Sequence, residues 1–594
     1  MPPCGPGASV ISLTGAAPEA RLYALKAFPS DGSGFGSMSD LMAALDRVIT
    51  LRRNFNRGLP SVPVAGSGTP NDPYVYDSLR VDVVNMSFGG VTQFAGREAF
   101  DVLLFEALDA GIVPVTSAAN DGPVAMTVGS PGTSFAALTV GALDAPGQSR
   151  VWHDLDDGAG AGLARRPTAH VQVANFSSRG PTADGRVDPD IAALGTGNLH
   201  IAAYGVTAAG TIDFCNWPEV LPGTCQATVA ISAGTSYATP IVAGAAALLR
   251  QAVPAATATQ IRNALHVAAN PAVFGDGSGP TDRGAGALDV PAALRLLRSG
   301  RVSRVVPDLE RERGRVTEDP ADALGRGGRS VSRNVQEAGF QPISFTNDVY
   351  VQRITNLLPG QAAQVFIPSD PTTSRLTVEL SDLSSTAPLT APSIDHALVQ
   401  LVDAPTGWLS EWEYAWERVP AGFSGWSRTI DRPQTGLVRL AVHGNTGNLG
   451  RFSATVTVRR QRTPKAAASA AGRIRQDEFL AFDVDVPTGA RRLEFEATWR
   501  QNWSRYPTND LDLQVVDPAG NVLTDGITWN SPERLTVDDP LPGTWQVVVV
   551  GFSIYRADGR ADVPGDPTGR VDEFALRATV DGRRLAARRS PSSR

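Results

Sequence analysis

Long apolar runs are missing from this sequence, and charge is scarce. No apolar run approaches the roughly 20 residues that a membrane-spanning helix needs, so the sequence predicts no membrane span. Charged residues make up 19% of the chain, and a formal net charge of −7 is mild for 594 residues, so nothing indicates a nucleic-acid partner. The opening residues, MPPCGPGASV, contain neither a basic nor an apolar segment, which excludes a signal peptide there.

Cysteine is also rare. The chain has three cysteines, and Cys215 and Cys225 enclose the loop-like stretch CNWPEVLPGTC. A disulfide between these two would suit an extracytoplasmic protein, whereas two free thiols are the alternative. The third, Cys4, has no obvious partner.

The chain is long enough for several domains at about 150 residues each. Hydrophobic residues make up 42% of it, enough for large cores, and 59 glycines and 44 prolines indicate many turns.

The most informative stretch runs from Ile231 to Leu249, ISAGTSYATPIVAGAAALL. Its small apolar residues predict a helix that is buried on all sides, because small side chains let neighbouring elements approach closely. Ser236 would then lie at the positive end of the helix dipole, which favours a nucleophile whose reaction develops negative charge. The alternative is that Ser236 only caps the helix, as serine often does.

The segment GTSYATPIVAGAAALL resembles the nucleophile motif of the subtilisin-like serine peptidases. Other segments agree with that family in the same order along the chain: Val83–Gly89, Val115–Gly122, Asn175–Pro181 and Pro189–Ala193. The resemblance covers roughly residues 14–298 and implies secretion or another extracytoplasmic location, a polypeptide substrate and no cofactor.

The order of elements predicts an α/β domain over residues 1–300, a mostly parallel sheet with helices on both faces, as the resemblance also implies. The segment between Asp144 and Val173 is expected to be a surface insertion. Expected strands are Leu22–Phe28, Val81–Met86 and Ile112–Thr116, and expected helices are Ser39–Leu51, Arg97–Ala110, Ala256–Ala269 and Pro291–Leu297.

Carried over by resemblance, Ser236 is the nucleophile, and Asn120 donates its amide to the oxyanion together with the Ser236 N–H. The alternative for Asn120 is a plain turn, since Asp121 and Gly122 follow it. Two edges would pair with an extended substrate. The first edge is formed by Ser87, Phe88 and Gly89, and the second by Ser117, Ala118 and Ala119. Ala119 stands where the family usually has glycine, which could narrow the pocket.

The family's aspartate and histidine motifs have no counterpart here. The histidines are His153, His170, His200, His266, His396 and His443, and none is followed by Gly-Thr. His153 precedes Asp154 and Asp156, but its place in the expected insertion favours a solvated loop. We expect an N-terminally incomplete serine endopeptidase that is poorly active as this chain alone; the alternatives are a pseudo-peptidase or an adhesive binding protein that uses the cleft and the C-terminal domains.

The second half of the chain changes character. Residues 301–336 are dense in charge and predict an exposed linker. Alternating runs predict β-sandwiches at 337–460 and 473–589, and the second resembles the pre-peptidase C-terminal type of domain. Structural calcium is conceivable at Asp510, Asp512 and Asp517, although solvated loop acids are the reading we favour, and no metal is assigned.

Overall fold

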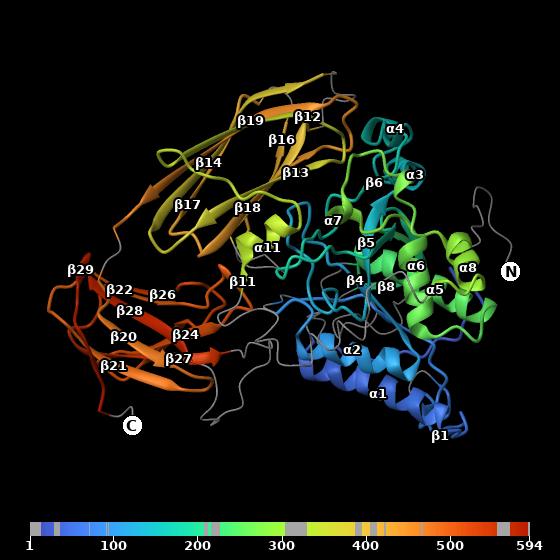
Figure 1. Cartoon of the computed structure of the whole chain (residues 1–594), viewed down its shortest axis with the longest axis horizontal. Coiled ribbons are helices and arrows are strands. Elements are labelled where there is room, and N and C mark those ends of the chain that lie inside the picture. The colour runs from blue at the N-terminus through green and yellow to red at the C-terminus, as the bar shows by residue number, and fades with distance from the viewer. Residues whose placement is uncertain are drawn as a thin grey trace.

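The computed structural model comprises an N-terminal α/β part followed by two strand-rich parts (Figure 1). It describes residues 14–28, 36–69, 72–90, 92, 94–206, 212–214, 226–302, 329–386, 395–403, 413–420, 423–464, 467–554 and 571–591. Cys4, Cys215 and Cys225 lie outside these residues, and so does the possible disulfide.

A mostly parallel sheet forms the centre of the N-terminal part. Its strands β3 (Val83–Met86), β4 (Val113–Ser117), β5 (Leu138–Asp144) and β7 (Ile191–Leu194) are parallel neighbours in that order. The short β6 (Gln172–Val173) pairs antiparallel with β5. Every residue of β4 and β5 is buried, as expected for strands that are covered on both faces. The expected α/β class is therefore confirmed.

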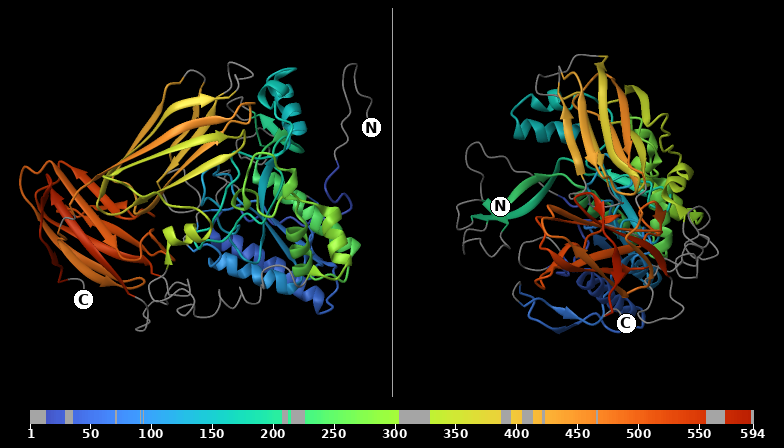
Figure 2. Two further views of the ribbon diagram at one scale, coloured as in Figure 1. Left: turned by 45° about the horizontal axis from the view of Figure 1, so that its top comes forward. Right: turned by 90° about the vertical axis from the view of Figure 1, so that its left-hand side faces the viewer.

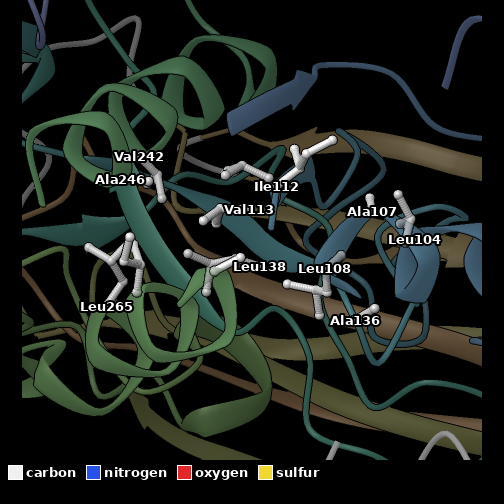
Figure 3. Close-up of a cluster of buried hydrophobic side chains, with 14 of the residues drawn as sticks. Leu104, Ala107, Leu108, Ile112, Val113, Ala136, Leu138, Val242, Ala246 and Leu265 are labelled. Atoms are coloured by element: carbon white, nitrogen blue, oxygen red, sulfur yellow. The ribbon is translucent and has the colours of Figure 1, made fainter. Parts of the chain in front are cut away.

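Helices pack on this sheet and share one apolar core with it (Figure 3). The helix α5 (Thr235–Ala252) contacts four of the strands, and its buried Ala238, Ala245 and Ala246 permit that close approach. On α2 (Ala99–Ala110), Leu104 and Leu108 belong to the same core. The other helices of this core are α1 (Met38–Asn56), α6 (Ala258–Ala268) and α8 (Val290–Arg298).

Two expectations for this part need correction. Residues 22–28 are not a strand: the segment lies on the surface, and the side chain of Leu22 is 95% exposed. The expected surface insertion between Asp144 and Val173 contains two helices instead of a loop. At its end, the Arg166 guanidinium forms an ion pair with the Asp144 carboxylate at 3.1 Å. Its helices are α3 (Pro146–Asp156) and α4 (Ala161–Arg165).

An antiparallel sheet precedes α5. Strand β8 (Asn198–Val206) pairs with β10 (Gln226–Ser232) and with β9 (Ile212–Phe214), and the β8–β10 pair extends away from the main body (Figure 2). The remaining short elements of the N-terminal part are β1 (Pro63–Ala65), β2 (Val75–Tyr76), the 3-10 helix η1 (Pro271–Val273) and α7 (Pro280–Arg283).

Two four-stranded antiparallel sheets enclose the next core, and we call this unit the first sandwich. One sheet has the order β12 (Val349–Leu357), β19 (Phe452–Arg462), β14 (Thr373–Ser385), β17 (Trp426–Asp431). The other has the order β13 (Ala362–Ser369), β18 (Gly436–Gly444), β15 (Ala397–Val402), β16 (Glu413–Val419). All residues of β15 and β18 are buried, so this second sheet is covered on both faces.

The last unit, which we call the second sandwich, also has two antiparallel sheets around one core. The first sheet is β20 (Ala470–Ile474), β28 (Asp572–Val580), β22 (Arg492–Trp499), β26 (Glu533–Asp538), with β29 (Arg583–Arg584) on β28. The second is β25 (Val522–Gly526), β24 (Asp510–Val516), β27 (Gly543–Ser553), β21 (Phe479–Val486), β30 (Ala587–Arg589).

The end of the expected linker is structured. Residues 303–328 lie outside the described part, but β11 (Arg329–Ser330) pairs with β23 (Arg505–Tyr506), and α11 (Val331–Glu337) follows directly. Val331 and Val335 are buried in a cluster that joins all three units, so residues 329–336 are not an exposed linker. No helix of the described residues is both long and apolar enough to span a membrane.

Candidate active site

Ser236 is the second residue of α5, and Gly234 occupies the N-cap position. The cap has φ of +151°, in the range that favours glycine. Ser236 is therefore inside the first turn, and the alternative that it serves as the N-cap is wrong. The Tyr237 N–H in that turn donates to the Gly234 carbonyl at 3.1 Å. The Ser236 N–H has no acceptor four residues earlier in the helix, so it can donate to a ligand.

Pro240 explains how Ser236 is held. A proline has no N–H to donate to the carbonyl four residues earlier, so Pro240 leaves the Ser236 C=O without its helical partner. The hydroxyl of Ser87, directly after β3, donates to this carbonyl oxygen at 2.9 Å. In return, Ser236 Oγ donates to the Ser87 carbonyl oxygen at 3.2 Å. The two serines thereby join the end of β3 to the start of α5.

Asn120 lies three residues beyond β4 and contacts the same helix start. Its Oδ1 accepts from the Thr235 N–H at 2.8 Å and from Thr235 Oγ1 at 3.0 Å. Because Oδ1 accepts from both donors of Thr235, Nδ2 faces away from them and lies near Gly234. It is 3.8 Å from the position that a Cβ of residue 234 would occupy. The Asn120 side chain is exposed, so Nδ2 can donate to a ligand.

The two expected substrate edges lie next to each other. Ser117 Oγ donates to the Phe88 carbonyl oxygen at 3.3 Å. The ring of Phe88 packs edge-on against Phe28 and Phe100, with centroids 5.6 and 5.9 Å away, so its side chain belongs to the core. Beyond Gly89, Gly90 and Ser130 exchange two backbone hydrogen bonds, at 2.9 and 3.1 Å.

Ala118 and Ala119 form the turn between β4 and Asn120. The Ala118 N–H donates to the Val140 carbonyl at 3.0 Å and is used within the sheet. Ala119 has φ of +82°, a left-handed conformation that is costly for any residue with a Cβ. The family's glycine at this position is thus explained by backbone conformation.

A buried carboxyl group holds Ser130, the residue that pairs with Gly90 beyond the first edge. Asp101 of α2 accepts from the Ser130 hydroxyl at 2.8 Å and from the Gly96 N–H at 3.0 Å. Burial, with help from the nearby charge of Glu98, raises the pKa of Asp101 to about 7. The group is a structural anchor because its oxygens are occupied by these donors.

None of the described histidines makes a hydrogen bond with Ser236. His200, on β8, contacts the neighbour of Ser236: its ring stacks on that of Tyr237 with the centroids 5.1 Å apart, and its Nε2 lies 2.8 Å from Ser232 Oγ. His153 lies on α3 with Nδ1 3.4 Å from Asp157, so it takes no part in this site.

The acids considered for calcium are engaged in other ways. Asp517 accepts from the backbone of Ala519 and Asn521 at 2.8 Å each, which is a turn. Asp510 and Asp512 are buried in β24, and burial raises the pKa of Asp512 to about 6. Within the described ranges, no group of three or more histidine, cysteine or acidic residues is placed to hold a metal ion.

The structure brings Ser236, Asn120 and both predicted edges close together, and it adds three contacts that sequence reasoning did not predict. Thr235 and Pro240 stand inside the recognised motif, and the spacing of Pro240 from Ser236 would have predicted a free carbonyl. The role of the Ser87 hydroxyl could not be predicted, because 149 residues separate it from Ser236.

Residues 4–291 match the model of the subtilase family. Serine protease AprX of Bacillus subtilis (strain 168) is 32% identical over 254 residues, 42% of this chain and 47% of that protein. Pyrolysin of Pyrococcus furiosus is 23% identical over 689 residues, 96% of this chain and 44% of that protein. Among solved structures, sphericase is 22% identical over 43% of this chain and 65% of that chain, with a TM-score of 0.28. The chain thus spans about half the length of the curated relatives it matches.

Proposed function

Since residues 4–291 are a subtilase-family domain, we propose that this chain is a serine-type endopeptidase that cleaves extended polypeptides through an acyl-enzyme on Ser236. The observation that carries the proposal is the meeting of Ser236, Thr235 and Asn120 at the first turn of α5. A nucleophile, a helix N-terminus and a side-chain amide at one point are what acyl transfer requires.

The chemistry follows from these positions. Ser236 Oγ attacks the scissile carbonyl carbon, and the carbonyl oxygen becomes an oxyanion. The Ser236 N–H and the Asn120 Nδ2 donate to that oxygen, while the Thr235 contacts fix the orientation of the amide. Loss of one such donor costs on the order of 10² to 10³ in rate in other serine peptidases.

The substrate strand would lie between residues 87–89 and 117–119. Backbone groups supply the pairing, because the Phe88 ring is packed into the core. Ala119 and its neighbours would border the side chain before the scissile bond.

Attack also requires a base for the Ser236 proton. Among the described residues, Ser236 Oγ donates to the Ser87 carbonyl and to no imidazole. The chain as given should therefore turn over peptides slowly, since loss of the histidine in the well-studied subtilisin case costs about 10⁶ in turnover.

The remaining assignments belong to the same proposal. We assign residues 1–300 to the peptidase domain and residues 337–460 and 473–589 to accessory β-sandwiches, the second of the pre-peptidase C-terminal type. The resemblance favours a secreted or extracytoplasmic protein whose partner is a polypeptide.

A serine-directed fluorophosphonate tests the nucleophile. We expect slow labelling of the full chain at Ser236, mapped by mass spectrometry of the peptides, and no labelling of Ser236→Ala. Equal labelling of the two proteins would show that Ser236 is not the nucleophile. Fast labelling that His200→Gln abolishes would identify His200 as the base.

The missing imidazole contact favours a second candidate, a pseudo-peptidase that binds extended peptides without cleaving them. In that case a peptide library would show saturable binding to the full chain, with no products and no Ser236-dependent label. The peptidase proposal predicts both products and label.

A further inference from the structure

Side chains of the first sandwich bind the backbone that directly follows Asn120. Gln400 Nε2 donates to the Asp121 carbonyl at 3.2 Å, and Gln400 Oε1 accepts from the Val124 N–H at 2.9 Å. Gln364 makes the same kind of pair, donating to Pro123 O at 2.8 Å and accepting from the Ala125 N–H at 3.0 Å.

Arg439 adds two further contacts to this segment. One terminal nitrogen of its guanidinium donates to the carbonyl oxygens of Ala125 at 2.7 Å and Met126 at 2.6 Å. We call residues 121–126 the Asn120 loop. Three side chains thus make six hydrogen bonds to its backbone.

We propose that Gln364, Gln400 and Arg439 are positioning residues that hold the Asn120 loop, and through it the Asn120 amide, in the geometry that oxyanion binding needs. This inference rests on the proposed function. If it holds, the first sandwich contributes positioning residues to the active site. These residues lie 239 to 314 positions after the loop residues that they bind.

The strand register explains why these side chains converge. Gln364 of β13 and Gln400 of β15 both lie opposite Ala441 of β18. The small Ala441 leaves room for a glutamine on each side, and Arg439 lies two residues away on the same face. The alternate residues point into the sandwich core, so this row points out of it. Figure 1 shows β13 and β18 on the side of the first sandwich nearer the other two units.

The contact is desolvated, which makes its hydrogen bonds costly to lose. Gln400 and Arg439 are each 1% exposed. Burial lowers the pKa of Arg439 to about 9, against the opposing effect of Asp121 and Asp403. Phe366 and Leu437 of the same sheet pack on Ala125 and Met126 in the cluster that joins the units.

The path to the oxyanion site is short. Gln400 holds the carbonyl of Asp121, the residue next to Asn120, whose Oδ1 in turn accepts from the N–H of Thr235. The N-terminal part has its own anchors for this loop: Asp121 N–H donates to Ser178 Oγ at 3.0 Å, and Gly122 N–H to Phe176 O at 2.8 Å. The experiment must therefore decide whether these local anchors suffice.

Amide hydrogen exchange of the full chain gives a readout that does not depend on activity. Each hydrogen bond of this kind changes an equilibrium by roughly fivefold, so Gln400→Ala, which removes two, should speed exchange of the Thr235 N–H about tenfold or more. Arg439→Met should do the same. The matched control is Gln434→Ala, which removes hydrogen bonds from the first sandwich to Asn530 and Ser531 and touches no residue of the loop.

Labelling of Ser236 by the fluorophosphonate supplies the second readout. If Gln400 acts through Asn120, Gln400→Ala should slow labelling about tenfold, whereas Asn120→Ala and the double variant should be equally slow. Additive losses would mean that Gln400 acts by another route, and would overturn the inference.

The two readouts separate the two proposals. Absence of Ser236-dependent label would defeat the proposed function, and the exchange rate at Thr235 would still decide the positioning role. Unchanged exchange at Thr235 in both Gln400→Ala and Arg439→Met would show that the local anchors suffice, and the inference would fail whatever the label shows.

Discussion

At the scale of single residues, the Ser87 hydroxyl replaces the N–H that Pro240 lacks, since it donates to the Ser236 carbonyl. We expect Ser87→Ala to destabilise the protein by about 1 kcal/mol, because it leaves the Ser236 carbonyl without a donor. In a Pro240→Ala background the helix regains an N–H for that carbonyl, so Ser87→Ala should cost less there. Denaturant midpoints of the four proteins measure this coupling, and equal costs in both backgrounds would contradict it.

Ala119 is a second residue whose backbone makes a prediction. Since its φ is +82°, Ala119→Gly should relieve strain and raise stability by roughly 0.5 to 1 kcal/mol despite the entropy cost of glycine. The neighbouring Ala118→Gly is the control and should destabilise, because Ala118 is fully buried and its φ is not positive. Urea unfolding monitored by tryptophan fluorescence would compare the two, and a loss in both would contradict the strain argument.

His443 predicts a pH dependence at the contact between the sandwich and the peptidase part. Burial, with the nearby Arg179 guanidinium, lowers its pKa from 6.5 to about 3, and its Nε2 is buried without a hydrogen-bond partner among the described residues. The unfolded chain gains this proton near pH 6.5 but the folded one does not. The stability that the protein has with His443 buried and neutral is therefore fully present above pH 6.5. It decreases as the pH falls from 6.5 toward 3.

Between pH 7 and pH 4.5 this loss should amount to roughly 2 to 3 kcal/mol. We expect His443→Gln to remove that part of the acid sensitivity, measured as thermal midpoints at the two pH values. As a control, the difference in midpoint between the two proteins should be the same at pH 8 and pH 9, where His443 is neutral in the folded and the unfolded chain. Asp101 and Asp403 have raised pKa values and act in the opposite direction, so the comparison is between variants rather than of the wild type alone.

At the scale of elements, sequence reasoning succeeded where a motif or a local period was complete. The small apolar run after Ser236 predicted α5, and the segments around Ser87 and Asn120 were placed beside it by order along the chain. It failed for residues 22–28 because a short apolar run does not distinguish a strand from an exposed segment. It also failed for 329–336, where three buried residues are hidden among charges: Val331, Asn334 and Val335.

The sheet β13–β18–β15–β16 illustrates the limit of such reasoning. The strand Gly436–Gly444, GLVRLAVHG, has an arginine and a histidine where an outward face is expected, and these positions suggest solvent. In the structure all nine residues are buried, since the second face of this sheet covers the Asn120 loop. No local pattern can predict a partner more than 300 residues away in the sequence.

At the scale of the whole molecule, the peptidase part is not expected to be independent. A fragment ending at residue 302 would expose Ala125, Met126 and Ala95, which the sandwiches bury. We expect it to melt at a lower temperature than the full chain and to bind a hydrophobic dye. A fragment ending at residue 464 keeps the first sandwich and should retain slow exchange at Thr235. Equal melting of the 302-residue fragment and the full chain would contradict this dependence.

The distance in sequence between the Asn120 loop and its partners has a consequence in time. Arg439 is polymerised 314 residues after Ala125. At about 5 to 20 residues per second, a ribosome needs roughly 15 to 60 s to cover that interval. Gln364 and Gln400 are made before Arg439, but their strands β13 and β15 both pair with β18, so the six hydrogen bonds can be complete only after β18 has been made. If Gln364, Gln400 and Arg439 position the oxyanion site as proposed, that site would be completed only after the first sandwich has been made, and the nascent chain would be inactive until then.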